Sequence, residues 1–136
     1  MKKLYKFLRT GLESDNGKDR KWVVGEWRHE GSIYICNSGF HASKTPLQAL
    51  GYVKGEILAE VEVRRQSIKE DDKECWSDMR IVKAYHWKKE DSVALSIFAA
   101  EQCIKNYEKV YPNDTRPRDA IKAAKKWLAE PTKANE

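Results

Sequence analysis

The chain has 136 residues, with 26 Lys or Arg against 21 Asp or Glu, which gives a formal net charge of +5. Its hydrophobic content of 40% and charged content of 35% are typical of one globular domain and exclude a disordered chain. No apolar run approaches the roughly 20 residues of a membrane-spanning helix. Lys6 and Arg9 interrupt any signal-peptide core, so we predict a cytoplasmic protein without a membrane partner.

In chain order, the first ninety residues predict a mainly antiparallel sheet with one short helix. Aromatic and β-branched residues cluster in short runs separated by turn-forming residues. Thr45 and Pro46 form a helix-start signal, because Thr can cap a helix and Pro suits its first position. The predicted helix covers residues 47–53, and the predicted strands are residues 4–9, 22–27, 33–36, 57–63 and 79–85. Residues 11–20 are predicted to form a loop, and residues 69–78 a charged connection.

The pattern changes at Asp91, where apolar residues begin to recur three and four positions apart. This spacing predicts a helix that Asp91 or Ser92 caps and that ends before Pro112. A second helix follows from Thr115 to Pro131. The predicted fold is therefore α+β: a small twisted, mainly antiparallel sheet with one short helix, packed on a C-terminal two-helix hairpin. Residues 1–90 form the β-rich portion, residues 91–130 the hairpin and residues 131–136 a frayed tail of a single compact domain.

The cysteines and histidines show no spacing that would form a metal site. The three cysteines are odd in number and far apart, so we predict buried reduced thiols and neither a disulfide framework nor a zinc site. The histidines likewise lack ligand spacing, and no cofactor is predicted from the residues. These residues are Cys36, Cys75, Cys103, His29, His41 and His86.

The segment "YPNDTRPRDAIKAAKKWL" (111–128) resembles a bacterial family of immunity proteins. That family carries a Tyr-Pro-x-Asp-x-Arg-Pro-Arg-x-Ala-Ile motif between two helices. Small proteins of phages and prophages also join such a hairpin to a segment similar to "GFHASKTPLQALGYVKGEILAEVEV" (39–63). The resemblance implies an accessory protein of the immunity or anti-defence type in a bacterial host cell.

The layout of residues 38–63 is also similar to the heart of the ADP-ribosyltransferase fold. On that resemblance His41 stands where the family places a ring against nicotinamide, and Arg9 lies in the element that grips NAD. Asp78 would take the place of the acidic residue, usually a glutamate, that holds the ribose. An enzyme of this class would use NAD, with His41 and Asp78 as its catalytic residues.

Five residues are candidates for one ligand pocket where the first strand, the "GFHAS" turn and the strand after Asp78 converge. His41 would stack or hydrogen-bond, Arg9 would hold negative charge, and two tryptophans would form the wall. Each has a structural alternative: His41 could close a turn by bonding to backbone, Ser43 could belong to that turn, and the tryptophans could be core residues. The five are Arg9, Trp22, Trp27, His41 and Ser43.

Two further sets of charged residues allow a functional and a structural interpretation. Arg116 and Arg118 flank Pro117 at a helix start, where positive charge is unfavourable. They could bind a partner, or clamp the hairpin by pairing with Asp114 or Asp119. Asp78, and the pair Glu60 and Glu62, are expected mainly as solvated surface acids.

The preferred hypothesis is binding without turnover, of a protein partner or a nucleotide-like ligand. An NAD-using transferase is the first alternative. Nucleic-acid binding is the second, because residues 1–28 contain eight Lys or Arg against four Asp or Glu. The sequence predicts no oligomeric state.

Overall fold

A computed structural model describes residues 1–17 and 19–131 and confirms the α+β class. It divides the chain into two compact units, Met1–Trp87 and Lys88–Glu136, here called the sheet unit and the helical unit. The boundary lies close to the predicted one at residue 90. The predicted packing of hairpin on sheet stays a prediction, and residues 132–136 of the predicted tail lie outside the described residues.

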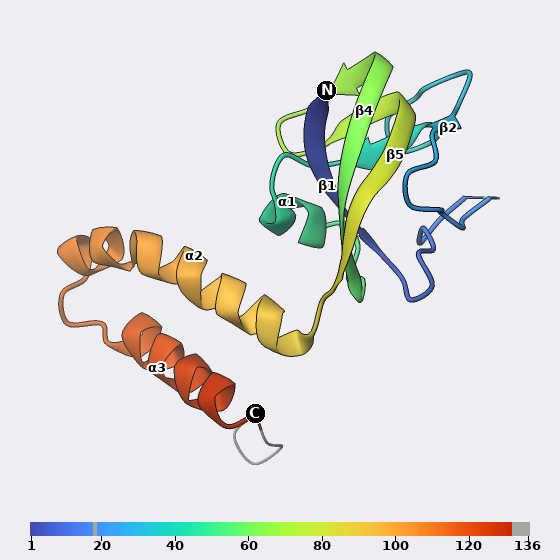
Figure 1. Ribbon diagram of the computed structural model, residues 1–136. Helices are drawn as coiled ribbons and strands as arrows, with labels where there is room; N and C mark the ends of the chain where they lie inside the picture. Colours follow the sequence, from blue (N-terminus) through green and yellow to red (C-terminus); the bar gives the residue numbers. More distant parts are fainter. Residues whose placement is uncertain (18, 132–136) are drawn as a thin grey trace. The chain divides into compact units, whose positions relative to one another are not determined.

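The sheet unit is built on two long antiparallel strands, β4 (Ile57–Lys69) and β5 (Glu74–His86), which lie side by side (Figure 1). β1 (Lys2–Leu8) pairs with the free edge of β4. The free edge of β5 pairs with the short strands β2 (Arg28–His29) and β3 (Phe40–Ala42). Every one of these pairings is antiparallel.

A bridge between β1 and the residue after β3 connects the two edges of this sheet. The backbone N–H groups of Tyr5 and Ser43 each donate to the other's carbonyl at 2.8 Å. The sheet therefore curls, because β3 pairs with β5 while its next residue pairs with β1. The curled sheet encloses one apolar core: Leu4, Leu8, Trp22, Ala42, Ile57, Ala59, Val61, Val63, Trp76, Met79 and Ile81.

The predicted N-terminal signal of the short helix is confirmed. The Thr45 hydroxyl accepts a hydrogen bond from the backbone N–H of Gln48 at 3.2 Å, and Pro46 is the first residue of α1 (Pro46–Leu50). Because this cap satisfies one of the donors at the helix start, it fixes where the helix begins. The helix is shorter than the predicted 47–53.

The connection predicted over residues 69–78 is wrong, because most of it is strand. The β4–β5 ladder continues to Lys69 opposite Glu74, although residues 64–69 are exposed and, apart from Ile68, polar, so they show no alternation of apolar and polar residues. The strand predicted over residues 22–27 is also absent. Gly25 has φ +88°, which interrupts an extended run, and Val24 makes only an isolated bridge with Ile81.

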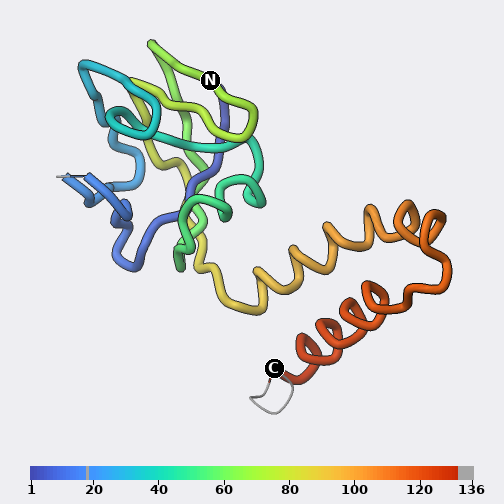
Figure 2. Tube along the Cα trace, turned by 180° about the vertical axis from the view of Figure 1, so that it is seen from behind, coloured from blue at the N-terminus to red at the C-terminus, as the bar shows by residue number. Residues whose placement is uncertain are grey.

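The helical unit consists of α2 (Lys89–Val110) and α3 (Arg116–Ala129), joined by a short connection (Figure 2). Asp91 is not the N-cap: its carboxylate accepts from the backbone N–H of Lys88, the actual cap, at 2.8 Å. Few side chains of this unit are buried, and a groove of about 630 Å³ lies along the apolar sides of both helices. No helix in the described part of the chain is both long and apolar enough to cross a bilayer.

Candidate functional site

An irregularity in the pairing of β4 brings the side chains of two neighbouring arginines to one carboxylate. Successive side chains of a regular strand point to opposite faces, but the register of β4 against β5 shifts between Arg64 and Ser67. Within this bulge Arg65 has φ +67°, a left-handed conformation that is strained for a residue with a side chain. Both Arg64 and Arg65 consequently reach the same carboxylate.

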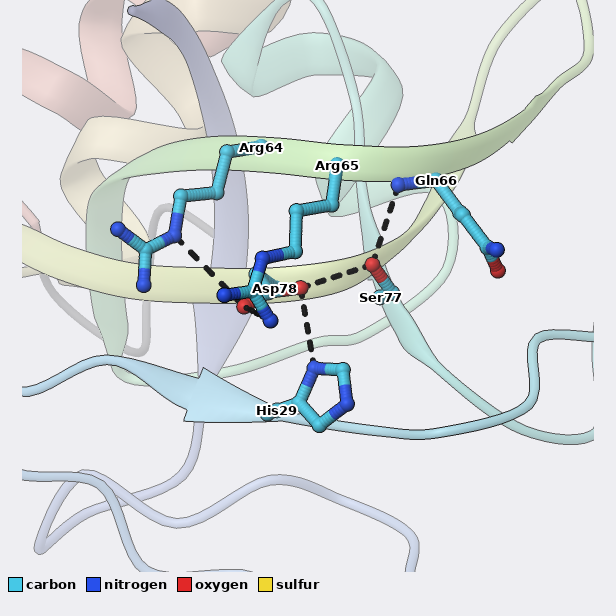
Figure 3. A network of polar contacts seen from close by, with 6 residues as sticks. All are labelled: His29, Arg64, Arg65, Gln66, Ser77 and Asp78. Carbon is cyan, nitrogen blue, oxygen red and sulfur yellow. Dashed lines mark hydrogen bonds and ion pairs between the residues drawn. The ribbon is translucent and has the colours of Figure 1, made fainter.

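That carboxylate belongs to Asp78 on β5, toward which the side chains of both arginines and of His29 point (Figure 3). Asp78 is only 1% exposed. Its Oδ1 lies 3.6 Å from Arg64 Nε and 3.4 Å from Arg65 Nη1. Its Oδ2 accepts from the Ser77 hydroxyl at 2.8 Å and lies 3.1 Å from His29 Nδ1. These four partners come from three strands. Arg64 and Arg65 belong to β4, Ser77 belongs to β5, and His29 belongs to β2, which pairs it directly with Asp78.

The contacts keep Asp78 ionised. Burial alone would raise the pKa of its carboxyl, but the hydrogen bonds from Ser77 and His29, with the charge of Arg65, hold that pKa below its ordinary value. Asp78 is therefore a fixed negative charge beneath two guanidiniums.

The two arginines retain hydrogen-bonding capacity. Their distances to Asp78 are those of ion pairs, and within residues 1–17 and 19–131 neither guanidinium donates a hydrogen bond to a protein group. Their side chains are 42% and 59% exposed. One buried carboxylate thus orients two guanidiniums whose N–H groups remain free, with an excess of positive charge.

Trp27 lies beside this cluster and contacts two arginines. The guanidinium carbon of Arg64 is 3.9 Å from the centre of its ring, and that of Arg80 is 4.9 Å away. Arg80 also donates from Nε and Nη2 to Glu62 at 2.8 and 2.6 Å, so its charge is balanced. We call His29, Arg64, Arg65, Asp78 and Trp27 the Asp78 cluster.

His41 closes a turn. Its Nε2 accepts a hydrogen bond from the backbone N–H of Cys36 at 2.9 Å. Burial, followed by the charges of Lys6 and Lys73, lowers the pKa of His41 below its ordinary value. The neutral ring fits this acceptor role, which is the structural alternative that the sequence left open.

The other predicted pocket residues lie in different places. Arg9 pairs with Asp15. Trp22 is 2% exposed, donates from Nε1 to the Ser14 hydroxyl at 2.7 Å, and packs its ring edge-on against another aromatic side chain. Ser43 is buried at the bridge to β1. Of the five predicted residues, only Trp27 belongs to the Asp78 cluster.

Several expectations for charged and sulfur side chains need correction. Asp78 is not a surface acid, and of the three cysteines only Cys75 is buried, while Cys36 and Cys103 are exposed. Sequence reasoning did not select His29, Arg64 or Arg65. The signal available for the two arginines was the point in β4 where alternation stops and two arginines follow each other; no such signal marks His29.

The charged pairs of the helical unit are internal. Arg116 donates from Nε and Nη2 to Asp114 at 2.9 and 2.8 Å, and the Tyr107 hydroxyl donates to the same carboxylate at 2.8 Å. Arg118 pairs with Glu108 at 2.8 and 2.7 Å, a partner that the sequence did not suggest. The clamp interpretation therefore describes both arginines in this structure.

The described part of the chain contains no group of three or more His, Cys, Asp or Glu side chains that could hold a metal ion. A family model described as "Domain of unknown function (DUF7666)" matches residues 2–91. No curated protein and no solved structure matches the chain. The matched segment contains the whole sheet unit from Lys2 onwards, and with it the Asp78 cluster.

Proposed function

The chain belongs to the DUF7666 family, and we propose that its sheet unit binds a phosphate-bearing, nucleotide-like ligand without turnover. The observation that carries this proposal is the convergence of Arg64 and Arg65 on one buried carboxylate with their N–H donors free. Guanidinium groups match the oxygens of a phosphate two at a time, and such charge-assisted bonds are stronger than neutral ones. The cluster offers two of these groups already oriented.

The strained backbone at Arg65 supports the same proposal. A left-handed, non-glycine residue in a bulge costs free energy, and such costs concentrate at functional sites. Removing the bulge would return Arg64 and Arg65 to opposite faces of the sheet. The strained bulge therefore keeps both guanidiniums on one face of the sheet, where they can bind the same phosphate group of a ligand.

The rest of the ligand would lie against flat side chains of the cluster. The guanidinium of Arg64 stacks on Trp27, and both are partly accessible. A nucleobase can stack on either kind of surface. This arrangement favours a nucleotide over inorganic phosphate alone.

Calorimetry with ADP, and with adenosine as the ligand that lacks phosphate, tests the proposal. ADP should bind and adenosine should bind at least about tenfold more weakly, because a charge-assisted hydrogen bond contributes about 1.5–3 kcal/mol. Arg64→Gln and Arg65→Gln should each weaken ADP binding by about tenfold or more. Arg118→Gln is the matched control, because it removes an arginine paired with Glu108 in the helical unit. Equal affinity for adenosine, or ADP binding unchanged in both cluster variants, would refute the proposal.

One observation favours turnover as a second candidate function at the same place. The buried Asp78 carboxylate engages His29 Nδ1, and the His29 side chain is 56% exposed, so Nε2 is available for acid–base chemistry. The NAD-using transferase alternative is tested by incubating the protein with NAD and analysing the products. Release of nicotinamide that His29→Ala abolishes would support the transferase; intact NAD would support binding alone.

Nucleic-acid binding and the phage accessory role stay predictions. A single-stranded oligonucleotide should bind with an affinity that falls steeply with salt if several phosphates are contacted. A nearly flat salt response would limit the ligand to a mononucleotide.

A further inference from the structure

Lys6 lies on the core-facing side of β1. Alternation along the strand places it on the same face as Leu4 and Leu8, which are 1% and 0% exposed. Its partner across the β1–β4 ladder is Ala59, which is also fully buried. A lysine therefore occupies a position where the strand pattern requires an apolar residue.

The surroundings of this amine contain no acid to neutralise it. Within the described residues, Lys6 has neither a carboxylate at ion-pair distance nor a hydrogen-bond acceptor. The two other lysines of β1 do have carboxylates: Lys2 pairs with Glu74, and Lys3 with Glu60 at 3.1 Å. In the part of the chain that the structure describes, Lys6 is therefore the one lysine of β1 that has no carboxylate beside its amine.

Lys6 Nζ instead lies 4.9 Å from the ring centre of Trp22. The guanidinium carbon of Arg28 is 4.5 Å from the same ring and 5.2 Å from that of Phe40. Arg28 is held in place by the backbone carbonyl of Asp19, at 2.6 Å, and by that residue's exposed carboxylate at 3.2 Å. An amine and a second cation thus share one aromatic environment.

Burial, followed by the charge of Arg28, lowers the pKa of Lys6 from 10.5 to about 8. At pH 7 about one amine in ten is then neutral, against about one in three thousand for an ordinary lysine. Only the neutral amine is a nucleophile. The nearby His41, whose own pKa Lys6 lowers, is neutral at the same pH and adds no competing positive charge.

We propose that Lys6 is a nucleophilic amine that forms an imine with a small carbonyl compound bearing a carboxylate, of the 2-oxo acid class. The nitrogen lone pair attacks the carbonyl carbon, and the carbonyl oxygen leaves as water with the two amine hydrogens. A carbon–nitrogen double bond replaces the carbon–oxygen one, so nothing is oxidised or reduced. The carboxylate of the compound would lie toward Arg28. This site is separate from the Asp78 cluster and does not depend on it.

Labelling of the wild-type chain tests the proposal directly. The protein is treated with glyoxylate at pH 7, imines are reduced with cyanoborohydride, and the modified lysines are quantified by peptide mass spectrometry. Lys3 is the internal control, because it lies on the same strand with its side chain 53% exposed. Lys6 should be labelled at least about tenfold faster than Lys3, with half of its maximal rate near pH 8, where half of its amine is neutral. Labelling no faster than that of Lys3, or a rate that still rises steeply above pH 10, would overturn the proposal.

A second measurement tests the class of carbonyl compound. Acetaldehyde has no carboxylate, so the ratio of glyoxylate to acetaldehyde labelling at Lys6 reports the contribution of the carboxylate. Arg28→Gln should lower this ratio by about tenfold, the usual effect of losing one charge-assisted hydrogen bond. Taking the ratio cancels any change in the fraction of neutral amine that the substitution causes. An unchanged ratio would exclude Arg28 as the carboxylate partner and overturn that part of the proposal.

Discussion

Lys6 and Asp78 are charged groups of the same sheet with opposite surroundings; Asp78 is buried and Lys6 is half-buried. Asp78 has four partners, whereas Lys6 lies against an aromatic ring with no acid beside it. The free energy of folding should therefore respond to the two side chains with opposite signs.

Lys6→Met should stabilise the protein at neutral pH. The folded-state pKa of about 8 lies below the ordinary 10.5, so folding disfavours the ammonium form. Stability is highest above about pH 10.5, falls as the pH drops toward 8, and carries the full penalty below that. The pKa difference of about 2.5, 10.5 minus 8, corresponds to a penalty of about 3 kcal/mol. Because Lys6→Met also loses the cation–π contact with Trp22, we expect a net gain in the free energy of unfolding of about 2 kcal/mol.

Urea unfolding at pH 7 and at pH 10 measures this effect. The gain in Lys6→Met should shrink at the higher pH, where wild-type Lys6 is mostly neutral in the folded state. Lys3→Met, in the exposed lysine of the same strand, should change little. A destabilised Lys6→Met variant at pH 7 would contradict the assignment of Lys6 as an unfavourable, half-buried cation.

Asp78→Asn should destabilise the protein by about 2 kcal/mol at pH 7. Breaking a buried pair costs about 3–5 kcal/mol, but solvent screens the partly exposed arginines and reduces the loss. Because the pKa of Asp78 is lowered by folding, its contribution is present above about pH 3.8 and is lost as the pH falls through the folded-state value. Urea midpoints of wild type and variant should thus converge in acid. Asp71→Asn, an exposed acid in the β4–β5 turn, should leave the midpoint unchanged at both pH values.

Among the connecting elements, the turn before β3 depends on one glycine. Gly39 has φ +95°, and a Cβ atom there would lie 2.6 Å from Cys75 Sγ and 2.9 Å from the Ile33 side chain. Gly39→Ala should lower the free energy of unfolding by about 3 kcal/mol, because strain and overlap add. Gly31→Ala is the control, because a Cβ there meets nothing within 4 Å, and its effect should stay within about 0.5 kcal/mol. Chemical denaturation that finds equal losses would show that the turn relaxes freely.

The connection between α2 and α3 depends on Asp114. Its carboxylate holds the side chain and backbone N–H of Arg116 and the hydroxyl of Tyr107, so it joins the end of one helix to the start of the next. The contacts with Arg116, then Tyr107, hold the pKa of Asp114 well below its ordinary range. Asp114→Ala should therefore lower the melting temperature of the helical circular dichroism signal. Arg118→Ala should lower it less, because that residue has the single partner Glu108. The reverse order would assign the clamp to Arg118.

At the level of elements, local signals were sufficient for some parts of the fold. Thr45 and Pro46 marked the start of α1, and the apolar spacing after residue 90 marked α2, because caps and helical periodicity act within a few residues. The outer half of the β4–β5 hairpin was missed, since residues 64–69 of β4 are exposed and, apart from Ile68, polar, while residues 74–78 of β5 mix acids with apolar side chains. Pairing there is carried by backbone hydrogen bonds, which leave no pattern in the side chains.

The candidate site was harder to predict than the fold. Trp22 and Trp27 are five positions apart and contact different arginines, because Gly25 turns the chain between them. The convergence of Arg64 and Arg65 depends on a bulge, which inverts the expected alternation. Burial of Asp78 depends on partners from two other strands, and only the assembled sheet reveals them.

On the scale of the whole molecule, the two units differ in how much core each one has. Among the described residues, the core cluster of the sheet unit contains eleven buried residues, whereas that of the helical unit contains three. The groove of about 630 Å³ along α2 and α3 also shows that their apolar sides are incompletely filled. Helices in proteins owe most of their stability to packing of an apolar face.

We therefore expect the two units to behave differently when separated. A fragment of residues 1–91, which contains the segment matched by the family, should unfold cooperatively in urea and keep the ADP affinity of the whole chain. A peptide of residues 88–131 should lose more than about half of its helical circular dichroism, because so few buried residues cannot offset the entropy of ordering two helices. A monomeric peptide with full helicity would show that the hairpin is stable by itself. A fragment 1–91 that fails to fold would show that the sheet requires the hairpin, as the predicted packing of one on the other implies.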